Sequence, residues 1–159
     1  MKKFLYAVMA MAFSVTFIGC DKEDSDKDDK DDEMTETVFY QGTLTAQRMQ
    51  PADSPGNPYT LQDVKVGLAI SREGDDANVV IYDMKFSEGM PLLPETLIPD
   101  LDYRAGRLSG DDIDPIIGEV AYPSYKVTDF DGSVGDGIIA FELYFGSYYT
   151  QFAGVEIAE

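Results

Sequence analysis

Apolar and polar side chains alternate with a period of two along much of the chain after residue 34. Residues 38–46 set an apolar face against a face of Gln and Thr, and residues 64–70 set an apolar face opposite Lys65 and Ser71. A period of two is typical of a half-buried β-strand, because successive side chains point to opposite sides of the sheet. Helical periodicity is hard to find. The pattern therefore predicts an antiparallel, all-β protein.

Turn residues separate these segments at hairpin spacing. Residues 73–76 predict a turn that leads into a returning strand at 78–86. Residues 146–147 predict the turn between a closing pair of strands, 138–145 and 148–155.

The remaining strand candidates are less regular. Asp131 and Gly132 predict another hairpin turn, because Asp-Gly is a frequent turn pair. Further short strands are predicted at residues 97–103, 107–113 and 119–128. Pro123 indicates an edge strand or a bulge in the last of these, since proline has no amide hydrogen to donate. About seven to nine short strands at this spacing predict a closed, up-and-down antiparallel barrel, with a β-sandwich as the alternative. The prolines of residues 90–99 leave the strand count there open.

The first 33 residues have a different character. Lys2 and Lys3 precede an apolar stretch at 4–18, and small Gly19 stands directly before Cys20. This is the order of charge, apolar segment and cleavage point in a lipoprotein signal. We therefore predict that the sulfur of Cys20 carries a lipid anchor.

Two alternatives explain the leader less well. A membrane span needs about 20 mostly apolar residues, whereas this stretch is shorter and contains Ser14 and Thr16. An ordinary secretory signal, which would leave Cys20 as a free thiol, favours a small residue where this chain has Phe17. The expected division is a lipoprotein signal peptide at 1–19, the lipidated cysteine with a disordered acidic tether at 20–33, and one β-barrel domain at 34–159.

The segment 21–33 consists of Asp, Glu, Lys and Ser, with no apolar side chain. Such a composition cannot bury enough surface to offset the entropy of ordering, so we expect a flexible spacer. An acidic run directly after the lipidated cysteine also resembles the export signal of lipoproteins in one phylum of Gram-negative gut bacteria. The resemblance implies an outer-membrane protein that faces the cell surface.

The formal net charge of −18 restricts the partners of the protein. After residue 33, seven basic residues are scattered among 21 acids. Nucleic acid is excluded, because a binder needs clustered Lys and Arg to displace counterions from phosphates. Attachment to a membrane must come from the lipid on Cys20 rather than from a basic patch. Because Cys20 is the only cysteine, no disulfide forms within the chain.

A series of short motifs spans nearly the whole body. In order, these are Tyr40-Gln-Gly-Thr-Leu, Ile81-Tyr-Asp-Met-Lys-Phe-Ser-Glu-Gly-Met-Pro, Ile98-Pro-Asp-Leu, Leu108-Ser-Gly-Asp, Asp131-Gly and Tyr149-Thr-Gln-Phe-Ala-Gly. Their order resembles that of the calycin-like β-barrel lipoproteins of gut commensal Gram-negative bacteria. The resemblance implies a lipocalin-like up-and-down barrel. It brings no established substrate, so no functional residue is carried over. The chain departs from the family in its acidity and in its Pro-rich stretch at 90–99.

The chemistry available to the body is limited. The chain has no His, its one Cys is assigned to lipid, and no Gly-rich phosphate loop opens a helix. Most nucleophile-base pairs and the commonest zinc ligands are therefore missing, and we expect neither catalysis nor a cofactor. A carboxylate-based hydrolase is the less favoured alternative, because sequence cannot select one pair among so many acids.

Calcium is the inorganic partner that the acids would suit best. Two groups offer hard oxygen ligands: Asp129, Asp131 and Asp136, or Asp111, Asp112 and Asp114. Neither group matches the EF-hand loop, and the turn preference of Asp and Gly explains Asp131–Gly132 without a metal. No metal ligand is assigned.

Two features suggest where a ligand could bind. The loop at 86–99 carries apolar residues that either cap the barrel mouth or plug its end as core. Five tyrosines offer rings for stacking on a sugar or an apolar ligand: Tyr122, Tyr125, Tyr144, Tyr148 and Tyr149. The first hypothesis is a non-enzymatic module that binds a small apolar or glycan ligand inside the barrel. The second is a protein-interaction or structural envelope component with a filled barrel.

Overall fold

The computed structural model describes residues 34–158. The predicted signal peptide, Cys20 and the acidic tether lie outside the described residues. The strands are β1 (Val38–Arg48), β2 (Tyr59–Ile70), β3 (Asp76–Ile81), β4 (Thr96–Arg104), β5 (Arg107–Gly110), β6 (Ile116–Ile117), β7 (Val120–Ala121), β8 (Val127–Gly135), β9 (Ile138–Phe145) and β10 (Tyr148–Ile157), with a 3-10 helix η1 (Pro123–Tyr125) before β8. Within the described residues, no helix is long and apolar enough to cross a membrane.

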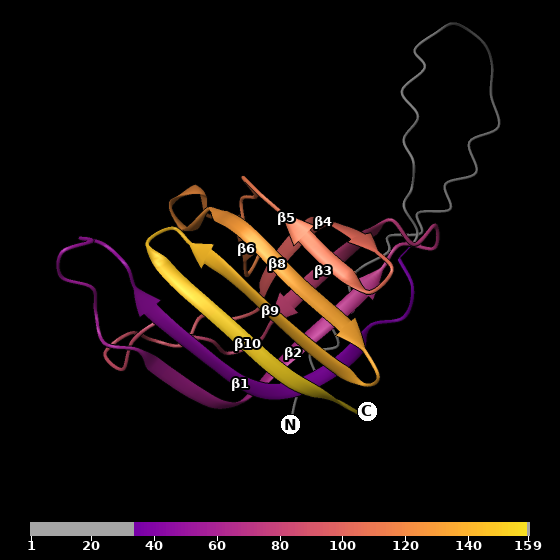
Figure 1. Cartoon of the computed structure of the whole chain (residues 1–159), viewed down its shortest axis with the longest axis horizontal. Helices are drawn as coiled ribbons and strands as arrows, with labels where there is room; N and C mark the ends of the chain where they lie inside the picture. Colours follow the sequence, from indigo (N-terminus) through magenta and orange to yellow (C-terminus); the bar gives the residue numbers. More distant parts are fainter. Residues whose placement is uncertain (1–33, 159) are drawn as a thin grey trace, which may run out of the picture.

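Eight of these strands close into a barrel (Figure 1). Each pairs in antiparallel fashion with the next along the chain, β5 passing to β8, and β10 returns to β1. The pairing of β3 with β4 completes the ring, and the short β6–β7 hairpin attaches to β4 beside β5. The predicted all-β, up-and-down antiparallel barrel is confirmed, and the β-sandwich alternative is wrong.

Bulges interrupt the alternation of inward and outward residues at three aspartates. Asp63, Asp100 and Asp129 have φ angles of 59°, 55° and 51°, and the strand register shifts at each. Inward apolar residues are there three positions apart instead of two: Leu61 and Val64, Ile98 and Leu101, Val127 and Phe130. Asp adopts the left-handed conformation more readily than most residues, so it suits the extra residue of a bulge.

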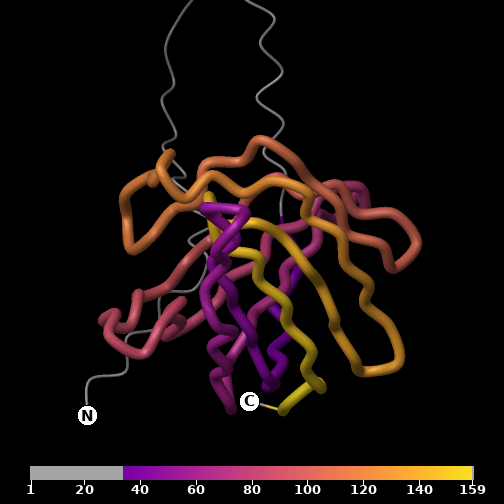
Figure 2. The backbone as a smooth tube through the Cα atoms, turned by 60° about the vertical axis from the view of Figure 1, so that its left-hand side comes forward, coloured from indigo at the N-terminus to yellow at the C-terminus, as the bar shows by residue number. Residues whose placement is uncertain are grey.

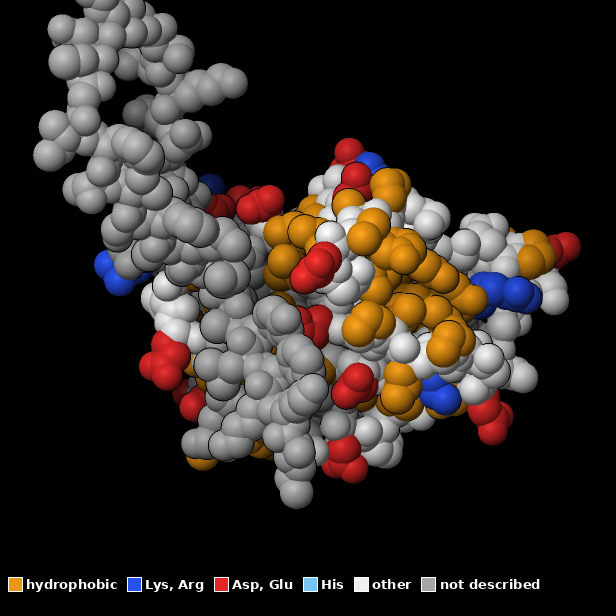
Figure 3. Space-filling model, turned by 180° about the vertical axis from the view of Figure 1, so that it is seen from behind, with side chains coloured by type: hydrophobic (Ala, Val, Ile, Leu, Met, Phe, Trp, Pro, Cys, Tyr) orange, Lys and Arg blue, Asp and Glu red, His pale blue; other side chains and the backbone are white. Residues whose placement is uncertain are grey.

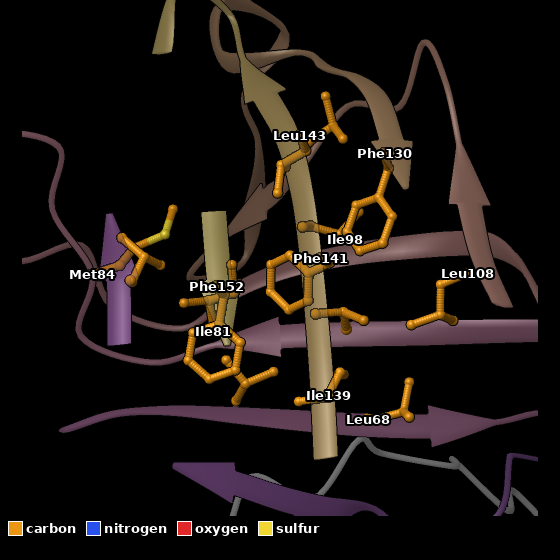
Figure 4. Packing of buried hydrophobic residues seen from close by; sticks show 14 of the residues in the cluster. Leu68, Ile81, Met84, Ile98, Leu108, Phe130, Ile139, Phe141, Leu143 and Phe152 are labelled. Atoms are coloured by element: carbon orange, nitrogen blue, oxygen red, sulfur yellow. The ribbon is translucent and has the colours of Figure 1, made fainter. Parts of the chain in front are cut away.

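The interior of the barrel is filled with side chains. Phe130, Phe141 and Phe152 stack across β8, β9 and β10, with ring centroids 5.2 Å apart in both contacts. Aliphatic side chains such as Ile81 and Ile98 lie toward these rings (Figure 4). The buried side chains form one hydrophobic cluster, so the barrel is a packed core.

The two ends of the barrel differ. Short turns at 71–75, 105–106 and 136–137 lie at one end, and the long connections 49–58, 82–95 and 111–126 lie at the other. Figure 2 shows two of the long connections on the left, opposite the turns of β4–β5 and β8–β9 on the right. Met34 pairs with Ser71, so the chain enters the body at the short-turn end.

The turn predicted at Asp131 and Gly132 is wrong. Both residues lie within β8, and the β8–β9 turn is formed by Asp136 and Gly137, which have φ angles of 53° and 73°. Gly132 serves packing instead, because a Cβ there would lie 2.8 Å from the Cβ of Phe141. A glycine inside a strand often marks such a close approach.

Three other predicted strands are wrong in part. The strand expected at 78–86 ends at Ile81, because Asp83 with a φ of 51° turns the chain into the barrel mouth. The strand expected at 119–128 is instead β7, the 3-10 helix and the start of β8, with Pro123 opening the helix. Proline suits a first helical position because its missing amide hydrogen is not needed there. The strand predicted at 107–113 ends at Gly110.

A groove on the outer wall of the barrel

An open groove of about 510 Å³ lies on the outer wall of the barrel, not inside it. Its lining comes entirely from strand residues of β1, β10, β9, β8 and β5. These residues are Thr43, Thr45, Arg107, Asp131, Gly132, Ser133, Ala140, Phe141, Glu142, Gln151, Phe152 and Ala153. Most of them are the outward partners of the inward core residues, as the alternation of a strand requires.

A row of small side chains forms the floor of the groove. Strand register places Thr43 opposite Ala153, Ala153 opposite Ala140, and Ala140 opposite Ser133. The row therefore runs across the strands from β1 to β8. Because these side chains are short, they leave a depression beside the longer side chains of the next row.

That next row is polar and forms one wall of the groove. Thr45 pairs with Gln151, Gln151 with Glu142, and Glu142 with Asp131. Side chains in such cross-strand positions are close enough to interact. The wall thus presents a hydroxyl, an amide and two carboxylates in sequence across four strands.

A hydrogen-bond network holds the middle of this wall. The phenol of Tyr149 donates to Oε2 of Glu142 at 2.6 Å, and Nε2 of Gln151 donates to the Tyr149 Oη at 2.9 Å. The bond to Glu142 is the main cause that raises the pKa of Tyr149 to about 12. Tyr149 is therefore a neutral donor at physiological pH. The ring of Tyr144 packs beside it, with centroids 5.2 Å apart.

An ion pair lies at the β5 end of the groove. Nη2 of Arg107 lies 2.6 Å from Oδ1 of Asp131, and the two side chains are 67% and 58% exposed. A pair with this exposure contributes at most about 1 kcal/mol to stability. Its effect on the groove is to balance the charge of Asp131, since Arg107 is the one cation among the lining residues.

The aspartates considered as candidate calcium ligands are not brought together. Within residues 34–158, no three acidic, His or Cys side chains form a group that could hold a metal ion. Asp131 pairs with Arg107, whereas Asp136 lies in the β8–β9 turn. Oδ1 of Asp111 accepts the backbone N–H of Asp129 at 3.2 Å.

Two members of the second candidate group, Asp112 and Asp114, are held by Lys126. Its Nζ lies 2.8 Å from Oδ1 of Asp112 and 3.5 Å from Oδ1 of Asp114. The hydrogen bond to Asp112 is the main cause that raises the pKa of Lys126. The Lys126 ammonium thus balances the negative charge of these two carboxylates, as a bound cation would.

The five candidate tyrosines divide between two places. Tyr144 and Tyr149 flank the outer groove, while Tyr148 points inward and stacks on Phe86 with ring centroids 4.6 Å apart. Tyr125 contacts the same Phe86, at 5.6 Å, and Tyr122 lies beside Tyr125. The sequence could not separate these two groups.

The apolar loop at 86–99 plugs the end of the barrel. Phe86 is 2% exposed and belongs to the core cluster, and Met90 and Leu93 pack against that cluster. Leu92 is 55% exposed and does not take part. Of the two interpretations of this loop, the plug fits the structure.

The groove contains a pair of carboxylates on facing strands, Asp131 and Glu142. A glycosidase needs such a pair, with one acid in surroundings that keep it protonated. Here both side chains are exposed, and each is bound to a polar partner, Arg107 or Tyr149. The arrangement suits hydrogen bonding to a ligand better than acid catalysis.

The groove could not be predicted from the sequence, because it forms only when strands that are distant in the chain pair in a particular register. Thr43 and Ala153 are neighbours in space but lie far apart in the chain, joined only by the closure of β1 on β10. The sequence did contain one indication of the groove. Glu142 on β9, and Gln151 and Ala153 on β10, occupy outward positions of the two strands whose bounds were predicted best.

Comparisons with known proteins identify no family. No family model matches the chain, and no curated protein matches it either. Among solved structures, one described as "Crystal Structure of Surface Lipoprotein" is similar with a TM-score of 0.48 and 9% identity over 77% of this chain. The chain spans 62% of the length of that structure. The calycin-like resemblance stays a prediction, while the barrel that it implies is confirmed by the strand order.

Proposed function

We propose that this protein is a non-enzymatic lipoprotein that is anchored to the outer membrane through Cys20 and binds a glycan on the outer wall of its barrel. The observation that carries the proposal is the groove, in which a polar row of Gln151, Glu142 and Asp131 runs beside a floor of small residues. The leader and the acidic segment at 21–33 support the anchor and the surface location.

Sugar chemistry matches the groups in the groove. Each sugar hydroxyl both donates and accepts a hydrogen bond, and the wall offers an amide that does both beside carboxylate acceptors. Tyr144 and Tyr149 add rings at its edge, where a tyrosine combines an apolar body with a polar tip. An apolar ligand inside the barrel is less well supported, because the interior is occupied by core side chains.

The point at which the chain enters the body leaves the groove accessible. The chain enters the body beside Ser71, at the short-turn end, whereas the groove lies on the side wall formed by β1, β10, β9, β8 and β5. The composition of residues 21–33 predicts a flexible spacer, for which the expected root-mean-square span is about 20 Å. A barrel held in this way leaves its side wall open to a ligand.

A second candidate function is a protein-interaction component of the envelope. Register places Val80, Leu97, Ile116 and Ala121 in one apolar row on the outward side of β3, β4, β6 and β7. In this row Ala121 is exposed, Leu97 and Ile116 are half-buried, and Val80 is buried. Figure 3 shows apolar side chains gathered on the face opposite to the view of Figure 1. Large exposed apolar patches often mark binding surfaces.

Two experiments on cells test the anchor and the location. Metabolic labelling with palmitate should mark the wild-type protein, and Cys20→Ser should abolish the label and the partitioning into detergent. Protease added to intact cells should remove the body, and replacing the acids of 21–33 by Ser and Ala should protect it. An unlabelled wild type would overturn the anchor, and unchanged protease sensitivity would overturn the export signal.

Affinity electrophoresis on gels that contain neutral polysaccharides tests the binding activity. Cellulose derivatives, galactomannan, xylan and starch should be compared, and at least one should retard the wild-type protein. Glu142→Gln should reduce that retardation, while Glu88→Gln, which removes the same charge from an exposed loop position, should not. No retardation by any neutral polysaccharide would contradict the proposal.

A further inference from the structure

We infer that the outer groove binds an internal stretch of an extended, uncharged glycan chain, and not a single sugar or a chain end. This inference rests on the function proposed above and names the class of glycan. It follows from the length of the groove, the openness of its ends and the charges along it.

The length of the groove favours a chain. Its lining runs across five neighbouring strands, from Thr43 on β1 to Arg107 on β5. Neighbouring strands lie about 4.8 Å apart, so the lining extends over about 19 Å. This span accommodates several sugar rings in a row, and a single ring would contact only two or three of the strands.

The ends of the groove favour an internal stretch. Every lining residue belongs to a strand, and none belongs to the long connections 49–58, 82–95 or 111–126. A pocket for a chain end needs side chains that block continuation of the chain. The last lining residues at the two sides are the short Thr43 and Thr45, and the exposed Arg107. A chain can continue past the two threonines directly. At the β5 end Arg107 lies opposite Ser133 in the floor row, and a chain passes there once this exposed side chain swings away from Asp131, because an exposed ion pair of this kind costs little to break.

The floor determines how such a chain would lie. Ala153, Ala140 and Ser133 are register neighbours, and the polar wall of Gln151 and Glu142 stands beside them. A chain that crosses the strands along this floor places its hydroxyls beside the wall over its whole length. A chain that ran parallel to the strands would cross the narrow floor at once and meet the longer side chains on either side, such as Gln151 and Glu142 of the wall.

The charges favour a neutral ligand. The wall carries two carboxylates, and the one lining cation, Arg107, already pairs with Asp131 at 2.6 Å. The formal charge of the whole chain is −18. Carboxylate or sulfate groups on a sugar would be repelled at short range and would find no free cation in the lining.

Isothermal titration of the detergent-solubilised, full-length mature protein tests this inference. The probes are cello-, manno- and xylo-oligosaccharides from monosaccharide to hexasaccharide, with oligogalacturonates of matched length as charged probes. For the neutral series that binds, affinity should rise with each added unit and level off once the groove is spanned. The charged series should bind at least about tenfold more weakly.

Two variants connect that length dependence to the groove. Ala140→Gln places a longer uncharged side chain on the outward floor and should weaken the hexasaccharide by about tenfold or more. Ala52→Gln makes the same change at an exposed position in the 49–58 connection, away from the groove, and should leave the affinity unchanged. Chemical reduction of the sugar at the chain end should also have no effect on the hexasaccharide.

The outcomes separate this inference from the proposed function. A monosaccharide that binds as tightly as the hexasaccharide, tighter binding of the charged series, or loss of binding after reduction of the chain end would overturn the extended-chain inference alone. Absence of binding by every glycan, or glycan binding that neither Ala140→Gln nor Glu142→Gln weakens, would overturn the glycan function itself.

Discussion

Phe86 stacks on Tyr148 with ring centroids 4.6 Å apart and an interplanar angle of 14°. The contact joins the loop at 82–95 to β10 and closes the barrel at its long-connection end. Phe86 also contacts Phe145 and Tyr125, at 5.4 and 5.6 Å. The loop is therefore held as part of the core.

Phe86→Ala should destabilise the protein strongly. Truncation of a buried aromatic side chain costs about 3–5 kcal/mol, because both burial and packing are lost. Urea denaturation followed by circular dichroism measures this change. Leu92→Ala, in the same loop but 55% exposed, should change stability by no more than about 0.5 kcal/mol. Equal effects of the two substitutions would contradict the plug.

Gly132→Ala tests the placement of Gly132 inside β8. The added Cβ would lie 2.8 Å from the Cβ of Phe141 and 3.1 Å from the carbonyl oxygen of Ala140, so stability should fall by about 1–3 kcal/mol. Gly89→Ala is the control, because a Cβ there meets nothing within 4 Å. Thermal unfolding compares the two variants. A neutral Gly132→Ala would contradict the close packing of Gly132 against Phe141.

Asp100→Val tests the origin of the bulges. A left-handed φ of 55° costs a side chain without a local hydrogen bond about 1–2 kcal/mol, and more when it is β-branched. Asp102→Val, two residues along the same strand, removes the same charge from an exposed position and should be close to neutral. Asp100→Gly should be tolerated, since glycine adopts positive φ readily. If Asp100→Val were as stable as Asp100→Gly, the bulge would not depend on this conformation.

Glu142→Gln should lower the pKa of Tyr149 from about 12 toward its ordinary value of 10.0. The carboxylate holds the phenolic proton, and an amide holds it less strongly. Because the folded-state pKa lies above the unfolded value, this interaction stabilises the fold fully below pH 10 and is lost as the pH rises toward about 12. Carbon NMR of labelled tyrosine, assigned with Tyr149→Phe, measures the titration. Glu88→Gln should leave the pKa of Tyr149 unchanged. A Tyr149 pKa that stays near 12 in Glu142→Gln would show that the hydrogen bond to Glu142 is not its cause.

The barrel could be predicted from the sequence where strands alternate cleanly. Ile139, Phe141, Leu143 and Phe145 face the core as their spacing indicates, and β9 has the predicted bounds. Alternation is local, so it can be recognised without knowledge of the fold. The predictions failed where one residue reverses the chain, as Asp83 does after Ile81.

A sequence signal for these points was present. Leu61-Gln-Asp-Val, Ile81-Tyr-Asp-Met, Ile98-Pro-Asp-Leu and Val127-Thr-Asp-Phe share the order apolar, any residue, Asp, apolar. In each, the Asp has a positive φ and the two apolar residues face the core. The groove had no comparable signal, because its rows exist only once distant strands are in register.

The most direct test of the account is chemical-shift mapping by NMR. Isotope-labelled protein should be titrated with whichever of cellohexaose, mannohexaose and xylohexaose it binds most tightly. We predict shifts at the backbone amides of Ala140, Glu142 and Gln151 on the outer wall, with Phe86 and Tyr148 unaffected. Shifts confined to Phe86, Tyr148 and their neighbours at the barrel mouth, with an unchanged outer wall, would contradict the central claim that ligand binds outside a filled barrel.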